Sequence, residues 1–194
     1  MARIGFKLAK YNKIDGTGYA SLTDNKVPVF EKVIDEKFSA EYNNAELYAN
    51  DALAESDYSF KKGTLSLTVA DDNDVMFAKL FGNTVEIEGK GVTLNVHDIS
   101  PEFGYGHIIP KLVDGKKVYK VEFFPRVKFT KVTSDNKTRG EGVEFNTTSI
   151  EGTVYPLETA VNGLEAGVWQ KHNTHLSYAE AEAYLDSLLT TAKA

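Results

Sequence analysis

The longest regular pattern of apolar and polar positions runs from Gly104 to Thr130 and contains one strong turn signal. Asp114-Gly115 favours a two-residue type I′ hairpin turn, because both central positions of that turn need positive φ. After the turn, apolar and polar side chains alternate: Tyr119, Val121, Phe123, Val127 and Phe129 are interleaved with Lys120, Glu122, Arg126, Lys128 and Thr130. A period of two predicts a long strand with one apolar face and one charged face.

The same hairpin predicts its own register and one irregularity. If the two turn residues form the whole loop, Leu112 pairs with Lys117 and Ile108 pairs with Val121. Pro125 cannot donate a hydrogen bond to a neighbouring strand, so a bulge or an edge position is expected there.

Shorter patterns predict further strands and two helices. Strands are expected at 4–11, from 27 to about 42, at 64–69, at 85–87, at 92–96, and at 143–155 with a bulge near Thr147-Thr148. Carboxylates before Val75 and a glycine after Phe81 predict a short helix between these residues. Ser177 and Glu180 form a capping box, which opens a C-terminal helix with an apolar stripe of Tyr178, Ala181, Leu185 and Leu188.

These elements predict a mainly β chain. The fold class that we expect is a β-sandwich of antiparallel strands, with a short flanking helix and a C-terminal helix packed outside, in a single domain spanning residues 1–194. Residues 43–57 do not fit the strand pattern, because they carry four carboxylates, several alanines and no lysine or arginine. The stretch is long for a plain connection, so we expect an insertion loop at about 43–60 that is either functional or disordered.

Composition narrows the classes of protein that fit. Hydrophobic residues make up 42% and charged residues 26% of the chain, as in soluble globular proteins. The absence of cysteine excludes a disulfide scaffold and a thiolate zinc site. We expect no secretion signal and no membrane-spanning helix, because no apolar run is long enough. A net charge of -6 argues against a protein that grips nucleic acid through a basic face.

Candidate chemical motifs each have a simpler interpretation. His172-x-x-His175 has metal-binding spacing only if it is helical, and no third ligand is evident. The carboxylates of residues 71–74 lack the remaining positions of a calcium loop and fit a helix cap. Glu86 and Glu88 point the same way on a strand, as in a glycosidase, but also as on any solvated strand. We therefore expect no catalytic residues, no cofactor and no metal.

The order of the motifs resembles one protein family. The segment FGYGHIIPKLVDGKKVYKVEFFPRVKF looks like the central hairpin of the major tail proteins of long-tailed, non-contractile bacteriophages. The insertion AEYNNAELYANDALAESDYSF, the strand GTLSLTVA, the helix ADDNDVMFAKLFG and the strand NTTSIEGTVYPLE stand in the order of that family. The resemblance covers nearly the whole chain, which differs in its fairly long C-terminal helix and in lacking an obvious immunoglobulin-like decoration domain.

The resemblance implies a tail-tube subunit. Such subunits assemble as hexameric rings that stack into a tube, and DNA passes through the tube without specific binding during genome ejection. The implied partners are other copies of the chain, the tape measure protein, and tail terminator or distal tail proteins. The implied location is the virion tail, preceded by the host cytoplasm during assembly. A monomeric β-sandwich binding module, for example for a glycan or a cell surface, is the alternative from another class.

Two sets of residues are candidates for these roles. Tyrosines give contact area at low entropy cost, so inter-subunit contacts are expected at Tyr42, Asn44, Tyr48, Asn50 and Tyr58. The polar strand faces beside the insertion are expected to line the lumen through Asp35, Lys37, Thr64, Ser66 and Thr68. A net negative lumen would repel phosphates, so the basic Lys120, Arg126 and Lys128 are expected to lie against acidic groups of a neighbouring subunit.

Overall fold

The computed structural model describes residues 2–3, 5–22, 26–30, 32–49, 52–70, 73–86, 91–134 and 147–191. Its strands are β1 (Ala2–Arg3), β2 (Leu8–Asp15), β3 (Gly18–Tyr19), β4 (Val29–Phe30), β5 (Val33–Ala49), β6 (Ala52–Val69), β7 (Thr84–Val85), β8 (Val92–Thr93), β9 (Glu102–Val113), β10 (Lys116–Ser134), β11 (Thr148–Val154) and β12 (Lys171–His175). Its helices are α1 (Asp74–Phe81) and α2 (Tyr178–Leu189). The predicted mainly β class is confirmed.

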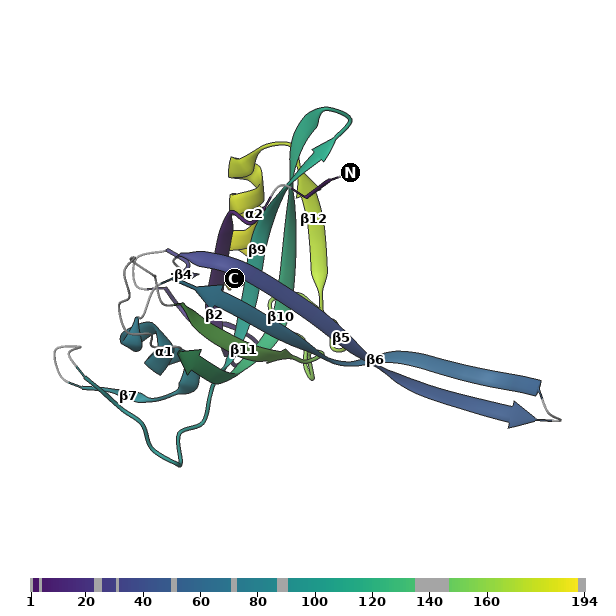
Figure 1. The fold of residues 1–194 in the computed structure, drawn as a ribbon, viewed down its shortest axis with the longest axis horizontal. Helices are drawn as coiled ribbons and strands as arrows, with labels where there is room; N and C mark the ends of the chain where they lie inside the picture. Colours follow the sequence, from purple (N-terminus) through teal and green to yellow (C-terminus); the bar gives the residue numbers. More distant parts are fainter. Residues whose placement is uncertain are drawn as a thin grey trace, which may run out of the picture.

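Ten strands of the described chain form one antiparallel sheet. Its order is β3-β2-β9-β10-β11-β6-β5, with β1 attached to β9, β12 to β10 and β4 to β2, while β7 and β8 pair separately. Figure 1 shows β9 and β10 rising beside α2, and β11, β6 and β5 crossing them at a steep angle. The sheet therefore folds over at β10, which belongs to both layers.

The inner core fills the space between the two layers. It contains buried side chains from β2, β4, β6, β9, β10, β11 and α1: Ala9, Tyr11, Phe30, Leu65, Leu67, Val69, Met76, Phe77, Leu80, Phe103, Tyr105, Phe124, Val127, Phe129, Ile150 and Val154. Leu65, Leu67 and Val69 are buried at alternate positions, as their pattern predicted. Two packed layers with alternating inward residues make the arrangement a sandwich.

A second core lies on the outer face of β9 and β10, under α2. Ser177 caps the helix as predicted, because the Glu180 backbone N–H donates to Ser177 Oγ at 3.2 Å, which is one of the two hydrogen bonds of a capping box. Ala181, Leu185 and Leu188 of the predicted stripe are buried. The C-terminal helix thus packs outside the sandwich, where it covers side chains of β9 and β10.

The central hairpin has the predicted turn and register. Asp114 and Gly115 have φ values of 49° and 76°, as a type I′ turn requires. Leu112 pairs with Lys117, and Ile108 pairs with Val121. The bulge expected at Pro125 is also present, because the β9–β10 register shifts between Phe124 and Val127.

The expected single apolar face of β10 is wrong. Pro125 and Arg126 together face one residue of β9, and this extra residue exchanges the two faces of the strand. Phe123 therefore lies in the outer core under α2, whereas Val127 and Phe129 lie in the inner core. One bulge lets the same strand serve both cores.

Several predicted strand boundaries are also corrected. The strand expected at 4–11 begins later and runs further, as β2 at Leu8–Asp15, and the one expected from 27 to about 42 is divided between β4 and β5. Lys32 separates β4 from β5, with a φ of 53° that no regular strand allows. The bulge expected near Thr147-Thr148 lies at the edge of the described chain, and the irregularity in that pairing is on β10, between Phe129 and Lys131.

Candidate assembly surfaces

β5 and β6 extend beyond the sandwich as a two-stranded arm, residues 42–49 and 52–60 (Figure 1). Their pairing continues from Tyr42 and Phe60 to Ala49 and Ala52, and no third strand joins them there in the described part of the chain. The insertion loop predicted at about 43–60 is therefore wrong in its conformation. Apolar alternation reveals strands that are half-buried, and the arm has no core of its own to produce that pattern.

A row of aromatic rings leads from the inner core onto the arm. Phe38 of β5 packs on Phe124, with ring centroids 4.7 Å apart, and on Trp169 at 6.0 Å. Trp169 stacks on Phe60 at 4.0 Å, and Phe60 contacts Tyr42 at 6.0 Å. The inward face of the sandwich thus continues onto one face of the arm, beyond the point where the chain's own second layer ends.

The predicted inter-subunit residues lie along this arm. Tyr42 and Tyr58 are 54% and 63% exposed, and Asn44 is exposed and pairs with Tyr58 across the strands. The Tyr58 hydroxyl donates to Glu46 Oε1 at 3.1 Å, which holds its ring against the arm. Tyr48 belongs to β5, and Asn50 lies outside the described residues. Among these, Tyr42, Asn44 and Tyr58 share one face.

The predicted lumen residues come together on the outward face of β5, β6 and β11. Asp35 pairs with Thr68 and Lys37 pairs with Ser66, and Thr64 follows on the same face of β6. The three residues of β6 also pair with β11 on their other side. Thr68 pairs with Ser149, Ser66 with Glu151 and Thr64 with Thr153. The structure therefore gathers all five candidates into one polar surface that carries charges of both signs.

Two of the three basic residues singled out on β10, Lys120 and Arg126, have acidic partners within the same chain. Arg126 makes a two-pronged ion pair with Glu102, with N–O distances of 2.7 and 2.8 Å, and contacts Glu158 at 2.8 Å. The hydrogen bonds that Arg126 donates to Glu102 are the main cause that raises the pKa of Arg126. Lys120 pairs with Glu122. Both cations thus have acidic partners in their own chain, which corrects the expectation that a neighbouring subunit supplies them.

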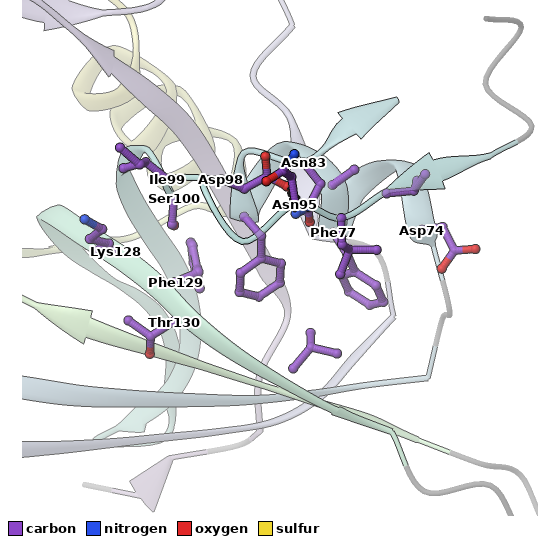
Figure 2. Close-up of a pocket in the computed structure, with 15 residues that line it drawn as sticks. Asp74, Phe77, Asn83, Asn95, Asp98, Ile99, Ser100, Lys128, Phe129 and Thr130 are labelled. Atoms are coloured by element: carbon purple, nitrogen blue, oxygen red, sulfur yellow. Dashed lines mark hydrogen bonds between the residues drawn. The ribbon is translucent and has the colours of Figure 1, made fainter. Parts of the chain in front are cut away.

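A groove of about 840 Å³ separates α1 and the loop after β8 from β10. Figure 2 shows Asn83, Asn95 and Asp98 gathered on one side and Lys128 and Thr130 of β10 on the other. The Asn83 side chain and the Asn95 backbone N–H donate to Asp98 Oδ2 at 2.8 and 2.7 Å. These two hydrogen bonds lower the pKa of Asp98, so this rim stays anionic.

The lining of the same groove is partly apolar. It includes the buried Phe77 and Phe129 and the exposed Leu94 and Ile99, with Val132 at its end. Exposed apolar side chains beside a groove are the kind of surface that binds another molecule.

The two histidines at 172 and 175 lie on a strand that the sequence patterns did not predict. In β12, His172 pairs with Glu122 and His175 with Tyr119, so two residues lie between them along an extended chain. Within the described residues, no group of three or more His, Asp or Glu side chains is placed to hold a metal ion. Over the same residues, the helices are too short or too polar to cross a membrane.

No protein-family model matches the chain, and no curated protein matches it. Sequence patterns also missed Trp169, which joins the arm to the core through Phe38 and Phe60. Its only signal is that it is the single tryptophan of the chain, and composition does not say what a tryptophan packs against.

Proposed function

We propose that this chain is a structural subunit that polymerises with copies of itself, as the tail-tube protein of a long-tailed bacteriophage. In this proposal the copies form hexameric rings, the rings stack into a tube in the virion tail, and DNA passes through the tube during genome ejection. The tape measure protein and the tail terminator or distal tail proteins then contact the tube inside and at its ends. The family and the ring number come from the resemblance of the motifs.

The arm is the observation that carries self-assembly. An isolated two-stranded hairpin is at best marginally stable in water, because it has no apolar face to bury. This arm nevertheless continues the core-facing side of the sandwich and exposes the rings of Tyr42 and Tyr58. A second copy that covers this face would extend the sandwich and bury both rings, which supports a protein–protein contact at the arm.

The free edge of β5 supports the same proposal. β5 ends the strand order of the sheet, and in the described chain only β6 pairs with it. A 17-residue edge presents a row of backbone donors and acceptors to another strand. A contact between this edge and a different surface of the next copy is heterologous, and such contacts close into rings when the rotation between copies allows it.

A monomeric binding module is the second candidate, and the groove beside α1 favours it. A groove with an apolar floor and a rim of Asn83, Asn95 and Asp98 offers the mixture of contacts that small ligands and glycans use. The two proposals differ in where a partner binds. Self-assembly requires the arm, whereas ligand binding by a monomer requires the groove.

The test is a shortened arm. Replacing residues 44–58 by Asn-Gly joins Asn43 to Ser59, which already pair, through a two-residue turn. We expect the wild-type chain to form rings or tubes at high concentration and the shortened chain to remain a folded monomer. Negative-stain electron microscopy and sedimentation velocity measure assembly, and circular dichroism measures folding.

Point variants locate the contact on one face of the arm. The Tyr42→Ser/Tyr58→Ser variant should weaken assembly at least tenfold in the concentration required, because two exposed rings lose their contact area. Asn43→Ala/Ser59→Ala is the matched control on the opposite face, where Asn43 Nδ2 donates to Ser59 Oγ. Tubes of normal length from the shortened chain would overturn the proposal. A wild-type monomer at every concentration that binds glycans would favour the binding module.

A further inference from the structure

A row of buried ionisable side chains crosses the interior of the sandwich. His107 of β9 lies between Glu36 of β5 and Glu122 of β10, and the three side chains are 3%, 8% and 10% exposed. His107 Nδ1 is 3.1 Å from Glu36 Oε2, and His107 Nε2 is 3.6 Å from Glu122 Oε2. The two carboxylates thus face opposite nitrogens of the same ring.

Two further polar side chains contact the outer ends of this row. The Tyr105 hydroxyl donates to Glu36 Oε2 at 2.7 Å, and Lys120 Nζ pairs with Glu122 Oε1. The carboxylate of Glu36 helps to raise the pKa of Tyr105, after burial, so Tyr105 remains a neutral donor. Lys120 therefore places a positive charge beside Glu122, and a protonated His107 would place one beside both carboxylates.

Several of the described neighbours of the ring are apolar. Phe6 stacks on His107 at a centroid distance of 5.5 Å, and the partner of His107 on β2 is Ala9. Phe124 of β10 lies 6.4 Å from the ring, and Lys111 lies further along the same face of β9. A carboxylate in such surroundings is costly unless a positive charge or several hydrogen bonds accompany it.

With both carboxylates ionised, only one protonation state of His107 suits both contacts. A neutral imidazole has one N–H and one lone pair, so one carboxylate would face an acceptor. The imidazolium places a positive charge and an N–H group beside both Glu36 and Glu122, and the two contacts, at 3.1 and 3.6 Å, are ion-pair contacts and not aligned hydrogen bonds. A metal ion does not fit the same atoms, because the carboxylates lie on opposite sides of the ring and do not converge on one point.

We propose that His107 is a proton-dependent strut: it is held as the imidazolium between Glu36 and Glu122, and loss of its proton loosens β5 from the layer of β9 and β10. Glu36 is the member of the cluster on β5, the strand that continues as the arm. The proton on His107 therefore controls how firmly the base of the arm is fixed to the sandwich. This inference concerns the single chain and does not depend on the tail-tube proposal.

The pH dependence has a definite sign. A histidine in an unfolded chain loses its proton at about pH 6.5. If folding holds the proton more tightly, the contribution of the strut to stability is complete below about pH 6.5. It is lost as the pH rises through the higher value at which folded His107 releases its proton.

Two-dimensional NMR of the histidine rings tests the protonation state in the wild-type chain. His97 and His172 are exposed and serve as internal references, and their variants to Gln assign the resonances. We expect His107 to remain an imidazolium at a pH at which both references are neutral, and the Glu36→Gln variant to lower its titration by about one pH unit or more. A His107 ring that is neutral when the references are still charged would overturn the proposal.

Amide hydrogen exchange tests the mechanical part. After correction for the intrinsic effect of pH, the amides of residues 33–40 in β5 should lose protection as His107 deprotonates, while those of α2 should not. Glu36→Gln should show low β5 protection already at low pH. Protection of β5 that does not change across the His107 titration would overturn the strut, even if the ring proved to be charged.

Discussion

Leu185 shows how tightly single side chains determine the outer core. It is fully buried in α2, and it lies against Gly106 of β9, where a Cβ atom would approach Leu185 Cδ1 to 2.4 Å. The same Cβ would lie 3.1 Å from Phe123 and 3.2 Å from the Glu122 carbonyl oxygen. A glycine at position 106 is therefore a packing requirement, because it lets α2 approach the sheet.

The Leu185→Asp variant should be strongly destabilised. It places an unpaired carboxylate in this contact, and we expect a loss of about 3–5 kcal/mol in the free energy of unfolding. Ala183→Asp puts the same charge on the exposed side of the same helix and should change stability by less than about 0.5 kcal/mol. Urea unfolding followed by circular dichroism measures both. Equal effects of the two variants would contradict the placement of α2.

At the scale of elements, α2 is fixed to β2 by a buried cation. Lys10 of β2 is 7% exposed, and its Nζ lies 2.7 Å from Asp186 and 2.8 Å from Glu182. Burial alone would lower the pKa of Lys10, but the hydrogen bonds that Lys10 donates to Asp186 and Glu182, with the attraction of their charges, outweigh it, so the pKa is raised. The ion pair therefore stabilises the folded chain while Lys10 is charged.

Replacing Lys10 by Met should detach this contact and remove its pH dependence. Both carboxylates are more than a third exposed, so solvent screening limits the expected loss to about 1–2 kcal/mol at pH 8. The difference between wild type and variant should persist below about pH 10.4, where unfolded lysine titrates, and disappear as the pH rises through the higher folded pKa. Burial raises the pKa of Tyr11 to about 12, but this contribution is the same in both proteins.

Urea unfolding between pH 8 and pH 11 measures that difference. Lys13→Met is the matched control, because Lys13 is an exposed lysine of the same strand. A constant difference between wild type and Lys10→Met over the whole range would show that lost packing, and not the charge, accounts for the effect.

The elements that the sequence predicted are those with local signals. Asp114-Gly115 defines the hairpin turn and hence the register of β9 and β10, and side-chain caps at Asn73 and Ser177 begin the two helices. The exchange of faces at Pro125 could not be read from alternation alone. The bulge changes which face the odd-numbered residues occupy, but apolar residues stay at odd positions on both sides of it.

The candidate surfaces were predicted less completely. The alternation of side chains along each strand correctly placed the five polar residues beside the insertion on one face, since alternate residues of a strand point to the same side. The arm itself and the Trp169 contact depend on what packs against them from distant parts of the chain, and no local pattern contains that information. The pairing of Arg126 with Glu102 and Glu158 is missed for the same reason.

At the scale of the whole molecule, the outward face of β5, β6 and β11 is the surface that we predict to line the bore of a tube. It is polar and exposed at Asp35, Lys37 and Thr64, and Glu151 of β11 adds a further carboxylate. A water-filled conduit for DNA requires a polar wall without a continuous basic surface, because lysine and arginine contacts hold phosphates tightly. The two best-paired cations of β10, Lys120 and Arg126, are already neutralised within the chain.

Cysteine labelling can locate this face in assembled tubes, since the natural chain contains no cysteine. Thr64→Cys places one thiol on the predicted wall of the bore, and Ala183→Cys places one on the exposed side of α2. In monomers, both thiols should react with a small maleimide and with a large polyethylene-glycol maleimide. In tubes, the thiol at position 64 should react with the small reagent only, because the large one enters a narrow bore poorly, whereas the thiol at position 183 should react with both. Rapid reaction of position 64 with the large reagent would place this face on the outside of the tube, and protection from both reagents would place it between subunits.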